Sequence, residues 1–349
     1  MLKSVLKLTL AAASALAISS AAALAQAKIE MKIAHFIVDQ HPMSVWIKNW
    51  AEKLEKDSGG RIVAKIFSNA QMGPPPAYYD LARTGQADVT WYLTGGTPGR
   101  FPITELINLP YLVGSSEIGT KVLNDPELRS KYLEPEHKGV KVLVLFTHQP
   151  GQVHTTKKPI KSLEDMKGLR IRFTSPAVRD FIAALGATPV GVTPTELADQ
   201  LQKGTIDGTF IDYGGAGIAF KLGGILKYTT EIYAYVTSFG LIMNPGFYDK
   251  LPADLKKVVD DSVKGQEKQI GDGWDLIDGP GKKLLVDGGM QPIKLSAEEN
   301  AKVRKIGTDL ADKTIKELEA KNLPARAAYE MMKALAEKHA KTSRNFWTQ

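Results

Sequence analysis

The six histidines of the chain are the first side chains to test for catalysis or metal binding, because imidazole serves in both. They are His35, His41, His137, His148, His154 and His339. None stand three to five positions apart, so the sequence holds no helical pair of zinc ligands. The absence of cysteine excludes disulfides, thiolate metal sites and cysteine nucleophiles. Neither a P-loop nor a serine nucleophile elbow is present, so no cofactor is expected and no enzyme class is indicated.

Two nearby carboxylates leave one catalytic alternative open. Asp207 and Asp212 could share acid–base work, although acids in a turn are typical caps. The glycine-rich residues 214–217 could hold a phosphate, but the Lys-Ser/Thr pair of a P-loop is missing and a tight bend fits better. The alternative function is therefore a secreted α/β enzyme that acts on a small acid with Asp207, Asp212 or a histidine.

The remaining candidates suit binding rather than catalysis. Arg172 lies in the apolar strand predicted for residues 169–173, where it is either a surface arginine or an anion ligand. Ligands of α/β proteins bind at the carboxyl ends of strands. The aromatic candidates at such ends are Trp91, Tyr92, Phe210 and Tyr213. Each of them either lines a pocket or packs against a sheet.

The elements that must position these residues alternate between strands and helices. Strands are predicted over 28–38, 61–67, 87–93, 140–147, 169–173 and 209–211. Helices begin between them, at proline-marked starts such as Pro42, Pro176 and Pro194. This order predicts an α/β protein of two similar lobes. The pattern also predicts a long strand over 233–243 that crosses between the lobes. A long helix is predicted from 252 through 274, bent by Gly271, Gly273 and Pro280.

The first 25 residues are predicted to be a secretory signal peptide. Lys3 and Lys7 precede an apolar run over residues 8–18, and Ala23-Leu24-Ala25 supplies the small-residue cleavage pattern. Removing the two lysines lowers the formal charge from +7 to +5 (7 − 2). That modest charge favours small acidic molecules and does not indicate nucleic acid. The sequence predicts an exported protein without a membrane span.

A series of short motifs extends through essentially the whole mature chain. In order they include Lys32-Ile33-Ala34-His35, Gln71-Met72-Gly73, Thr84-Gly85-Gln86-Ala87-Asp88, Met166-Lys167-Gly168-Leu169-Arg170-Ile171-Arg172, Leu185-Gly186-Ala187-Thr188-Pro189-Val190 and Gln202-Lys203-Gly204-Thr205-Ile206-Asp207-Gly208. In this order and spacing they resemble the DctP-type solute-binding proteins of tripartite ATP-independent periplasmic (TRAP) transporters.

This resemblance implies a periplasmic binding protein that delivers an organic acid anion to TRAP permease membrane subunits. Its two lobes are joined by crossing strands and a long helix that spans both. Residues 28–150 with about 241–283 would form lobe I, and residues 151–240 with about 284–349 lobe II. Arg172 matches the arginine that pairs with the substrate carboxylate in this family, which decides between its two interpretations. A planar guanidinium offers a carboxylate two parallel donors.

The ligand class is predicted from what surrounds Arg172. Residues 152–156 and 209–213 depart from the family pattern, so the resemblance does not transfer dicarboxylate or sialic-acid specificity. The expected cleft is rich in rings (Phe36, Trp91, Tyr92, Phe210 and Tyr213) and poor in a second fixed positive charge. This composition predicts a monocarboxylate, with aromatic acids ahead of succinate or malate. His35 or His154 could instead supply a partner for a second carboxylate.

Overall fold

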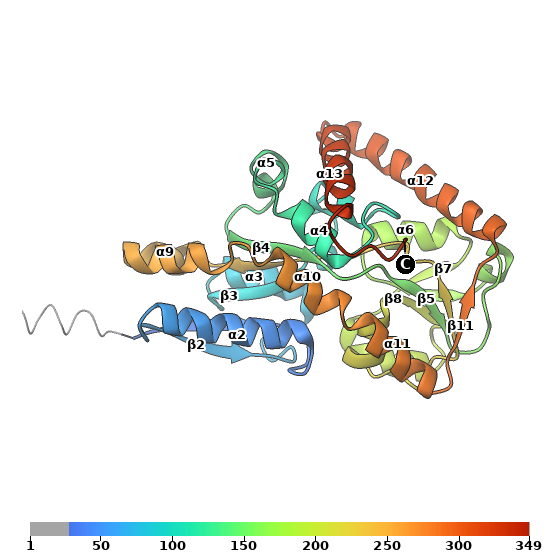
Figure 1. The fold of residues 1–349 in the computed structure, drawn as a ribbon, viewed down its shortest axis with the longest axis horizontal. Coiled ribbons are helices and arrows are strands. Elements are labelled where there is room, and N and C mark those ends of the chain that lie inside the picture. Colours follow the sequence, from blue (N-terminus) through green and yellow to red (C-terminus); the bar gives the residue numbers. More distant parts are fainter. Residues whose placement is uncertain (1–27, 349) are drawn as a thin grey trace, which may run out of the picture.

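The computed structural model describes residues 28–348, so the predicted signal peptide lies outside the described residues. The structure contains two β-sheets, one after the other along the long axis of the molecule, and each has helices on its faces (Figure 1). The strand order is β2-β1-β3-β10-β4 in the first sheet and β11-β9-β5-β8-β6-β7 in the second. The predicted α/β fold with two lobes therefore agrees with the structure.

The first sheet contains the four earliest strands of the chain and one later strand, β10. Its members are β1 (Ile29–Ala34), β2 (Ile62–Phe67), β3 (Val89–Leu93), β4 (Lys141–Thr147) and β10 (Ser238–Met243). The strand β1 pairs in parallel with β2 and β3, whereas β10 runs antiparallel between β3 and β4. Helices α2 (Pro42–Asp57) and α3 (Tyr78–Arg83) pack on this sheet. Every residue of β10 is buried, as expected for a central strand with both faces covered.

The second sheet is formed mostly by the middle of the chain. Its strands are β5 (Gln152–Thr155), β6 (Arg170–Phe173), β7 (Thr188–Gly191), β8 (Gly208–Ile211), β9 (Tyr228–Glu231) and β11 (Gln291–Lys294). The strand β6 pairs in parallel with β7 and β8, and β5 pairs antiparallel with β8 and β9. Helices α6 (Pro176–Ala184) and α7 (Leu197–Gln202) belong to this region. Ser175 caps α6 and Pro176 opens it, so the helix starts where its sequence predicts.

Two neighbouring segments carry the chain from one sheet to the other. We call residues 148–151, between β4 and β5, the first crossing segment, and residues 232–237, between β9 and β10, the second. They bind each other: Gly151 N donates to Tyr235 O (2.8 Å) and Ala234 N donates to Gly151 O (3.2 Å). A Cβ atom at Gly151 would lie 2.4 Å from the Tyr235 ring, so only glycine fits there.

The predicted single strand over 233–243 is wrong in its first half. Only Ser238–Met243 forms a strand, and Tyr233 has a positive φ of 44°. Gln152 explains the difference, because its Oε1 accepts hydrogen bonds from Ile232 N (2.8 Å) and Tyr233 N (3.0 Å). This side chain takes the place of a neighbouring strand, which the local sequence pattern does not reveal.

The helical segment after β10 runs along both lobes, as the resemblance implies, but in pieces. It consists of α8 (Pro245–Lys250), α9 (Ala253–Ser262), α10 (Glu267–Asp275) and α11 (Asp278–Asp287). The predicted helix from 252 through 274 breaks at Gly265, whose φ is +71°. Gly271 lies inside α10 and packs against the backbone of Glu117, which leaves no room for a Cβ atom.

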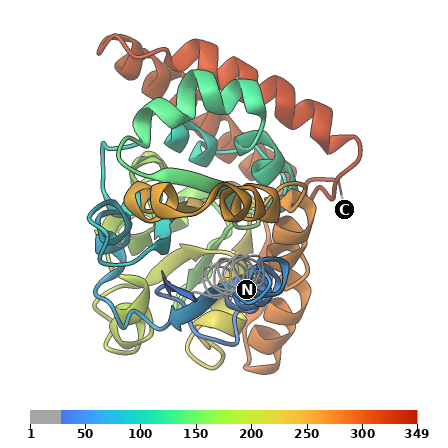
Figure 2. The same cartoon turned by 90° about the vertical axis from the view of Figure 1, so that its left-hand side faces the viewer.

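The last two helices lie together on one side of the molecule, which both views show (Figures 1 and 2). They are α12 (Ala297–Glu319) and α13 (Ala325–Ala340). α12 contacts α6 of the second lobe, and α13 contacts α4 (Ser116–Leu123), which precedes the short α5 (Pro126–Leu128). No helix within residues 28–348 combines the length and the apolar character that crossing a membrane requires.

Candidate functional site

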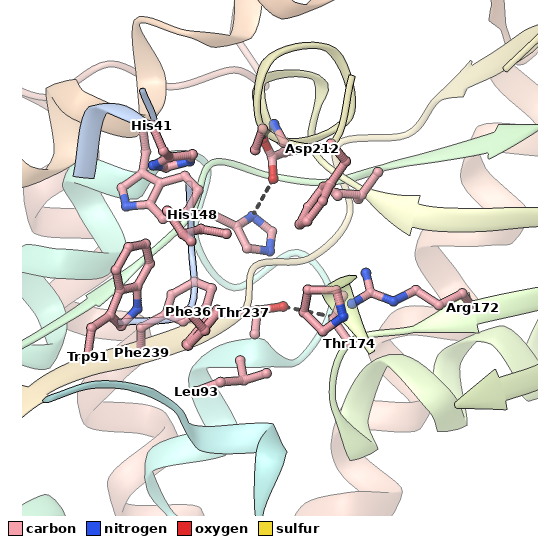
Figure 3. A pocket seen from close by; sticks show the side chains of 17 residues that line it. Phe36, His41, Trp91, Leu93, His148, Arg172, Thr174, Asp212, Thr237 and Phe239 are labelled. Carbon is pink, nitrogen blue, oxygen red and sulfur yellow. Dashed lines mark hydrogen bonds and ion pairs between the residues drawn. The ribbon is translucent and has the colours of Figure 1, made fainter. Parts of the chain in front are cut away.

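A cavity lies where the two sheets and the two crossing segments meet (Figure 3). It contains about 530 Å³ of empty space, the part open to solvent included. Ligand pockets of proteins usually combine an apolar lining with a few polar groups. This cavity fits that description, because most of its lining side chains are apolar.

One side of the cavity is aromatic, and we call it the aromatic wall. It consists of Phe36, Trp91, Phe239 and Trp274, all of them buried. Ring centroids lie 5.3 Å apart for Phe36 and Trp91 and 5.6 Å apart for Phe239 and Trp274, the second pair being stacked. Trp91 comes from β3 and Phe239 from β10, its antiparallel neighbour. The wall therefore presents flat apolar surfaces, and aromatic rings prefer such neighbours.

Three polar side chains also line the cavity, Arg172, Asp212 and His148, and we call them the polar wall. Figure 3 shows the Arg172 side chain reaching from β6 toward the cavity, with Phe36, Trp91 and Phe239 on the far side. Arg172 is only 4% exposed, and its Nε donates to Val192 O (3.1 Å). Burial lowers the pKa of Arg172 to about 10, so the side chain remains a cation at neutral pH.

The buried charge of Arg172 has no acidic partner within salt-bridge distance among residues 28–348. The other arginine of the same strand provides the contrast: Arg170 is exposed and bonds to both carboxylate oxygens of Asp207 (2.9 and 3.0 Å). A buried charge is costly unless an opposite charge and hydrogen bonds compensate it. The site therefore suits an anion that lies against the Arg172 guanidinium.

His148 and Asp212 form a buried pair beside Arg172. His148 belongs to the first crossing segment and Asp212 follows β8 directly, and Figure 3 shows them facing each other. His148 Nδ1 lies 3.7 Å from Asp212 Oδ2, and Asp212 Oδ1 accepts a hydrogen bond from Gly215 N (2.6 Å). Burial lowers the pKa of His148 and raises that of Asp212.

His41 adds a neutral polar group to the aromatic wall. Its Nδ1 accepts a hydrogen bond from Met43 N (3.1 Å) and so caps α2, while its ring lies 4.6 Å from that of Trp274. Burial lowers the pKa of His41 to about 3. Because Nδ1 accepts a bond, the proton of the neutral ring sits on Nε2. His41 is therefore an uncharged donor and brings no second cation to the cavity.

Of the seven ligand-binding residues that the sequence predicts, two line the cavity: Arg172 and Trp91. Tyr92 follows Trp91 in β3 and so points to the opposite face, where its hydroxyl bonds to His137. Phe210 likewise precedes the cavity residue Ile211 in β8 and packs against Phe181 and Tyr235. For both residues the alternation of side chains along the strand directs the ring away from the cavity.

The other three predicted ligand residues also lie outside the cavity lining. His154 bonds through its two ring nitrogens to Thr229 Oγ1 (2.7 Å) and Ile211 O (3.1 Å). Tyr213 donates to Glu231 Oε1 (3.0 Å), and His35 is buried with its ring 6.1 Å from that of Trp91. These three residues, like Tyr92 and Phe210, therefore do not contribute to the cavity lining.

The structure also separates the two carboxylates of the enzyme alternative. Asp207 is bound to Arg170 in the turn before β8, whereas Asp212 faces His148 in the cavity. The glycines between 214 and 217 serve close packing, since a Cβ atom at Gly217 would lie 2.3 Å from Gly281 O. Neither feature provides paired catalytic carboxylates or a phosphate cradle.

Sequence reasoning missed His148, His41, Thr174, Thr237 and Trp274 as cavity residues. His148 and Thr237 lie in the crossing segments, and Thr237 Oγ1 donates to Thr174 Oγ1 (2.9 Å) at the cavity (Figure 3). One signal was available, because His148 directly follows an apolar strand and precedes Pro150-Gly151. Polar residues at such a strand end commonly reach a ligand site.

Comparison with known sequences places most of the chain in one family. The sequence model of the bacterial extracellular solute-binding proteins, family 7 (DctP), matches residues 33–318. A solute-binding protein of Verminephrobacter eiseniae is 28% identical over 248 residues, which is 70% of this chain and 73% of that protein. The C4-dicarboxylate-binding periplasmic protein DctP of Rhodobacter capsulatus is 24% identical over 307 residues, 85% and 90% of the two chains.

Solved structures of similar sequence have the same fold. A marine metagenome TRAP solute-binding protein specific for aromatic acid ligands, in complex with metahydroxyphenylacetate, has a TM-score of 0.84 at 31% identity and covers 89% of this chain and 99% of its own. A TRAP solute-binding protein of Rhodoferax ferrireducens with copurified benzoate has a TM-score of 0.85 at 28% identity, covering 91% and 100%. A Bordetella bronchiseptica TRAP protein with bound (R)- and (S)-mandelate has a TM-score of 0.81 at 26% identity, covering 89% and 99%.

Proposed function

We propose a function from one premise: the chain belongs to family 7 of the bacterial extracellular solute-binding proteins, whose model matches most of its length. It is a solute-binding protein that captures an organic acid anion for a TRAP transporter. Its preferred ligand is a monocarboxylate with an aromatic body. The protein acts in the periplasm after export, delivers the ligand to the membrane permease subunits, and carries out no chemical conversion.

Arg172 is the observation that carries this proposal. It is a buried cation at the cavity, without an acidic partner within reach in residues 28–348. A ligand carboxylate would supply the missing charge and accept two parallel hydrogen bonds from the guanidinium. Val192 O takes only Nε, which leaves the terminal nitrogens for this contact.

The aromatic wall supports a monocarboxylate over a dicarboxylate. Arg172 is the only Lys or Arg side chain among the residues that line the cavity in residues 28–348, and His41 is neutral at physiological pH. A second buried carboxylate would lack a cation and meet Asp212, which costs several kcal/mol. Three similar solved proteins hold metahydroxyphenylacetate, benzoate and mandelate, all of them aromatic monocarboxylates.

The lobe boundaries belong to the same proposal. Residues 28–150 with about 241–283 form lobe I, and residues 151–240 with about 284–349 form lobe II. The membership of the strands in the two sheets supports this division except at β10, a strand of the first sheet whose first three residues, 238–240, fall within the bounds of lobe II. The contact of α13 with α4 ties the last helix to lobe I as well. The crossing segments then act as the hinge, and the cavity lies directly at that hinge.

Calorimetric titration with benzoate, a hydroxycinnamate, lactate and succinate tests the ligand class. We expect the aromatic acids to bind most tightly and succinate most weakly, because only succinate brings a second charge. Analysis of the ligands after long incubation should return them unchanged, which separates a binding protein from an enzyme. Tighter binding of succinate than of all three monocarboxylates would contradict the proposed ligand class. Product formation would contradict the proposed function itself.

A further inference from the structure

His148 presents one ring nitrogen to the cavity and uses the other inside the protein. Its Nδ1 lies within hydrogen-bond distance of Gln149 O and 3.7 Å from the Asp212 carboxylate. Both neighbours are acceptors, so the proton of the neutral ring sits on Nδ1. The second ring nitrogen, Nε2, then carries a lone pair. Figure 3 shows it on the side of the ring that faces away from Asp212, toward Thr237.

The groups around His148 keep its ring neutral. Burial lowers its pKa, the nearby charge of Arg172 lowers it further, and Asp212 and the Gln149 carbonyl raise it only in part. The other neighbours are the rings of Tyr235, Phe239 and Trp274, with centroids at 5.6, 6.2 and 6.1 Å. The imidazole is therefore a buried, oriented acceptor beside a buried cation.

This acceptor restricts what a ligand can place next to it. A carboxylate oxygen held by Arg172 would meet the lone pair of Nε2 without a proton between them, which is unfavourable. An apolar group there would leave the buried acceptor without a partner. A hydroxyl group of the ligand satisfies the site, because it donates its proton to Nε2. Buried sites built for a hydroxyl reject analogues that lack it.

We propose that His148 selects ligands that carry a hydroxyl group beside their carboxylate, that is, aromatic 2-hydroxy acids. The inference deepens the proposed function and rests on it: Arg172 holds the carboxylate, the aromatic wall holds the ring, and His148 Nε2 accepts the hydroxyl proton. Asp212 and Gln149 O are positioning groups that keep the proton on Nδ1. His148 thus determines specificity within the class of monocarboxylates.

Two pairs of acids that differ only in the hydroxyl group test this assignment by calorimetry. They are mandelate with phenylacetate, and 3-phenyllactate with 3-phenylpropionate. The wild-type protein should bind the hydroxy acid of each pair about tenfold more tightly, the effect of one well-placed buried hydrogen bond. His148→Asn retains an amide donor near Nδ1 and removes Nε2, so the preference should fall to about onefold while phenylacetate affinity changes little.

Two further variants make the comparison specific. His148→Gln places an amide oxygen near the position of Nε2 and should keep part of the preference. His339→Asn makes the same substitution on α13, outside the cavity lining, and should keep all of it. Thermal unfolding without ligand checks that each variant is folded. If His148→Asn does not fold, His148→Gln replaces it in the paired comparison, and its preference for the hydroxy acids should be smaller than that of the wild-type protein.

The outcomes separate this inference from the function beneath it. Equal wild-type affinity within each pair overturns the role of His148 and leaves the capture of aromatic monocarboxylates standing. A preference that persists in His148→Asn, or an equal loss of both acids in that variant, overturns it as well. If none of the four acids binds to the wild-type protein, the proposed ligand class fails and the inference fails with it. A preference that disappears only with Nε2 supports it.

Discussion

The aromatic wall of the cavity comes mainly from the first sheet, whereas Arg172 and Asp212 of the polar wall come from the second, and the two walls would hold a ligand by different forces. Trp91 and Phe239 lie on strands of the first sheet and offer apolar surface. Arg172 lies in β6 of the second sheet and Asp212 directly follows β8 of the same sheet, and both offer charge and directed hydrogen bonds. Apolar contact depends on area and tolerates many shapes. A buried ion pair tolerates few, because its energy depends on geometry and on complete pairing.

This difference implies that the two walls contribute differently to the selection of a ligand. In the proposed function the polar wall would determine whether a molecule binds at all, since an uncompensated Arg172 would make every ligand without an anion unfavourable. The aromatic wall would then determine how tightly each acid binds, according to the apolar surface that the acid buries. Substitutions in the polar wall should therefore cost much more affinity than substitutions of similar size in the aromatic wall.

The largest effect is expected from Arg172→Ala. Truncating one member of a buried ion pair costs about 2–5 kcal/mol, or roughly 30-fold to more than 1,000-fold in affinity. Calorimetry with benzoate should show this loss for every carboxylate tested. Arg170→Ala, in the same strand but exposed and paired to Asp207, is the matched control and should bind normally. A loss below threefold in Arg172→Ala would show that the anion lies elsewhere.

The next effect concerns the neutral state of His41 in the aromatic wall. An unfolded histidine titrates near pH 6.5, whereas burial lowers the pKa of His41 in the folded protein to about 3. Below pH 6.5 the unfolded chain binds a proton that the folded chain excludes. The stability linked to neutral His41 is therefore full above pH 6.5 and is lost as the pH falls toward 3.

His41→Asn isolates this contribution, since asparagine keeps an acceptor for Met43 N at the start of α2. The free energy of unfolding of the wild-type protein should fall more steeply with decreasing pH than that of the variant. The difference in slope should reach about 1.4 kcal/mol per pH unit between pH 6 and 4. Denaturant unfolding at several pH values measures it. Parallel curves for the two proteins would mean that His41 is protonated in the folded state.

A smaller effect on affinity is expected from the removal of one ring of the aromatic wall. Phe239→Leu removes one ring that stacks on Trp274 and keeps an apolar side chain. The affinity for aromatic acids should fall about 2- to 12-fold, which corresponds to 0.5–1.5 kcal/mol for one aromatic contact. Lactate should be affected less, because it has no ring. A uniform loss for lactate and benzoate would indicate that the variant disturbs the hinge instead of the wall.

The smallest signal is a change of shape. A ligand that touches both walls shifts the population toward the arrangement in which both walls are near. Small-angle scattering should show a lower radius of gyration with saturating benzoate than without it. Arg172→Ala at the same ligand concentration should show no such change. An unchanged wild-type curve at saturation would argue that the lobes do not move when the ligand binds.

Several features of the fold were predictable because they depend on neighbouring residues. Ser175 with Pro176, and His41 with Pro42, start helices by local geometry, and the structure has both helices there. The alternation of strands and helices predicted two α/β lobes for the same reason. Gly265, in contrast, is not identifiable from the sequence as the break in the helix after β10. A glycine in a polar helical segment is compatible both with a continuous helix and with a helix end.

The cavity was predictable only in part. Trp91 and Tyr92 are adjacent, similar in character and at the same strand end, and the sequence does not say which of them faces the ligand. That choice follows from the register of β3 with β10 and from which face the helices cover. His154 was a reasonable candidate by type, yet its two nitrogens bond to Thr229 and Ile211, which are distant in sequence.

The sequence by itself determined the class of the molecule: its helix starts, its alternating elements and its lack of thiol chemistry. Through a resemblance it also predicted a ligand role for Arg172. These properties depend on residue type and short spacing, which are visible along the chain. Only the tertiary structure decided that His148, Asp212 and Arg172 meet in one cavity opposite Phe36 and Trp91. Their meeting depends on two crossing segments and two sheet registers, and such long-range pairing is set by packing of the whole chain.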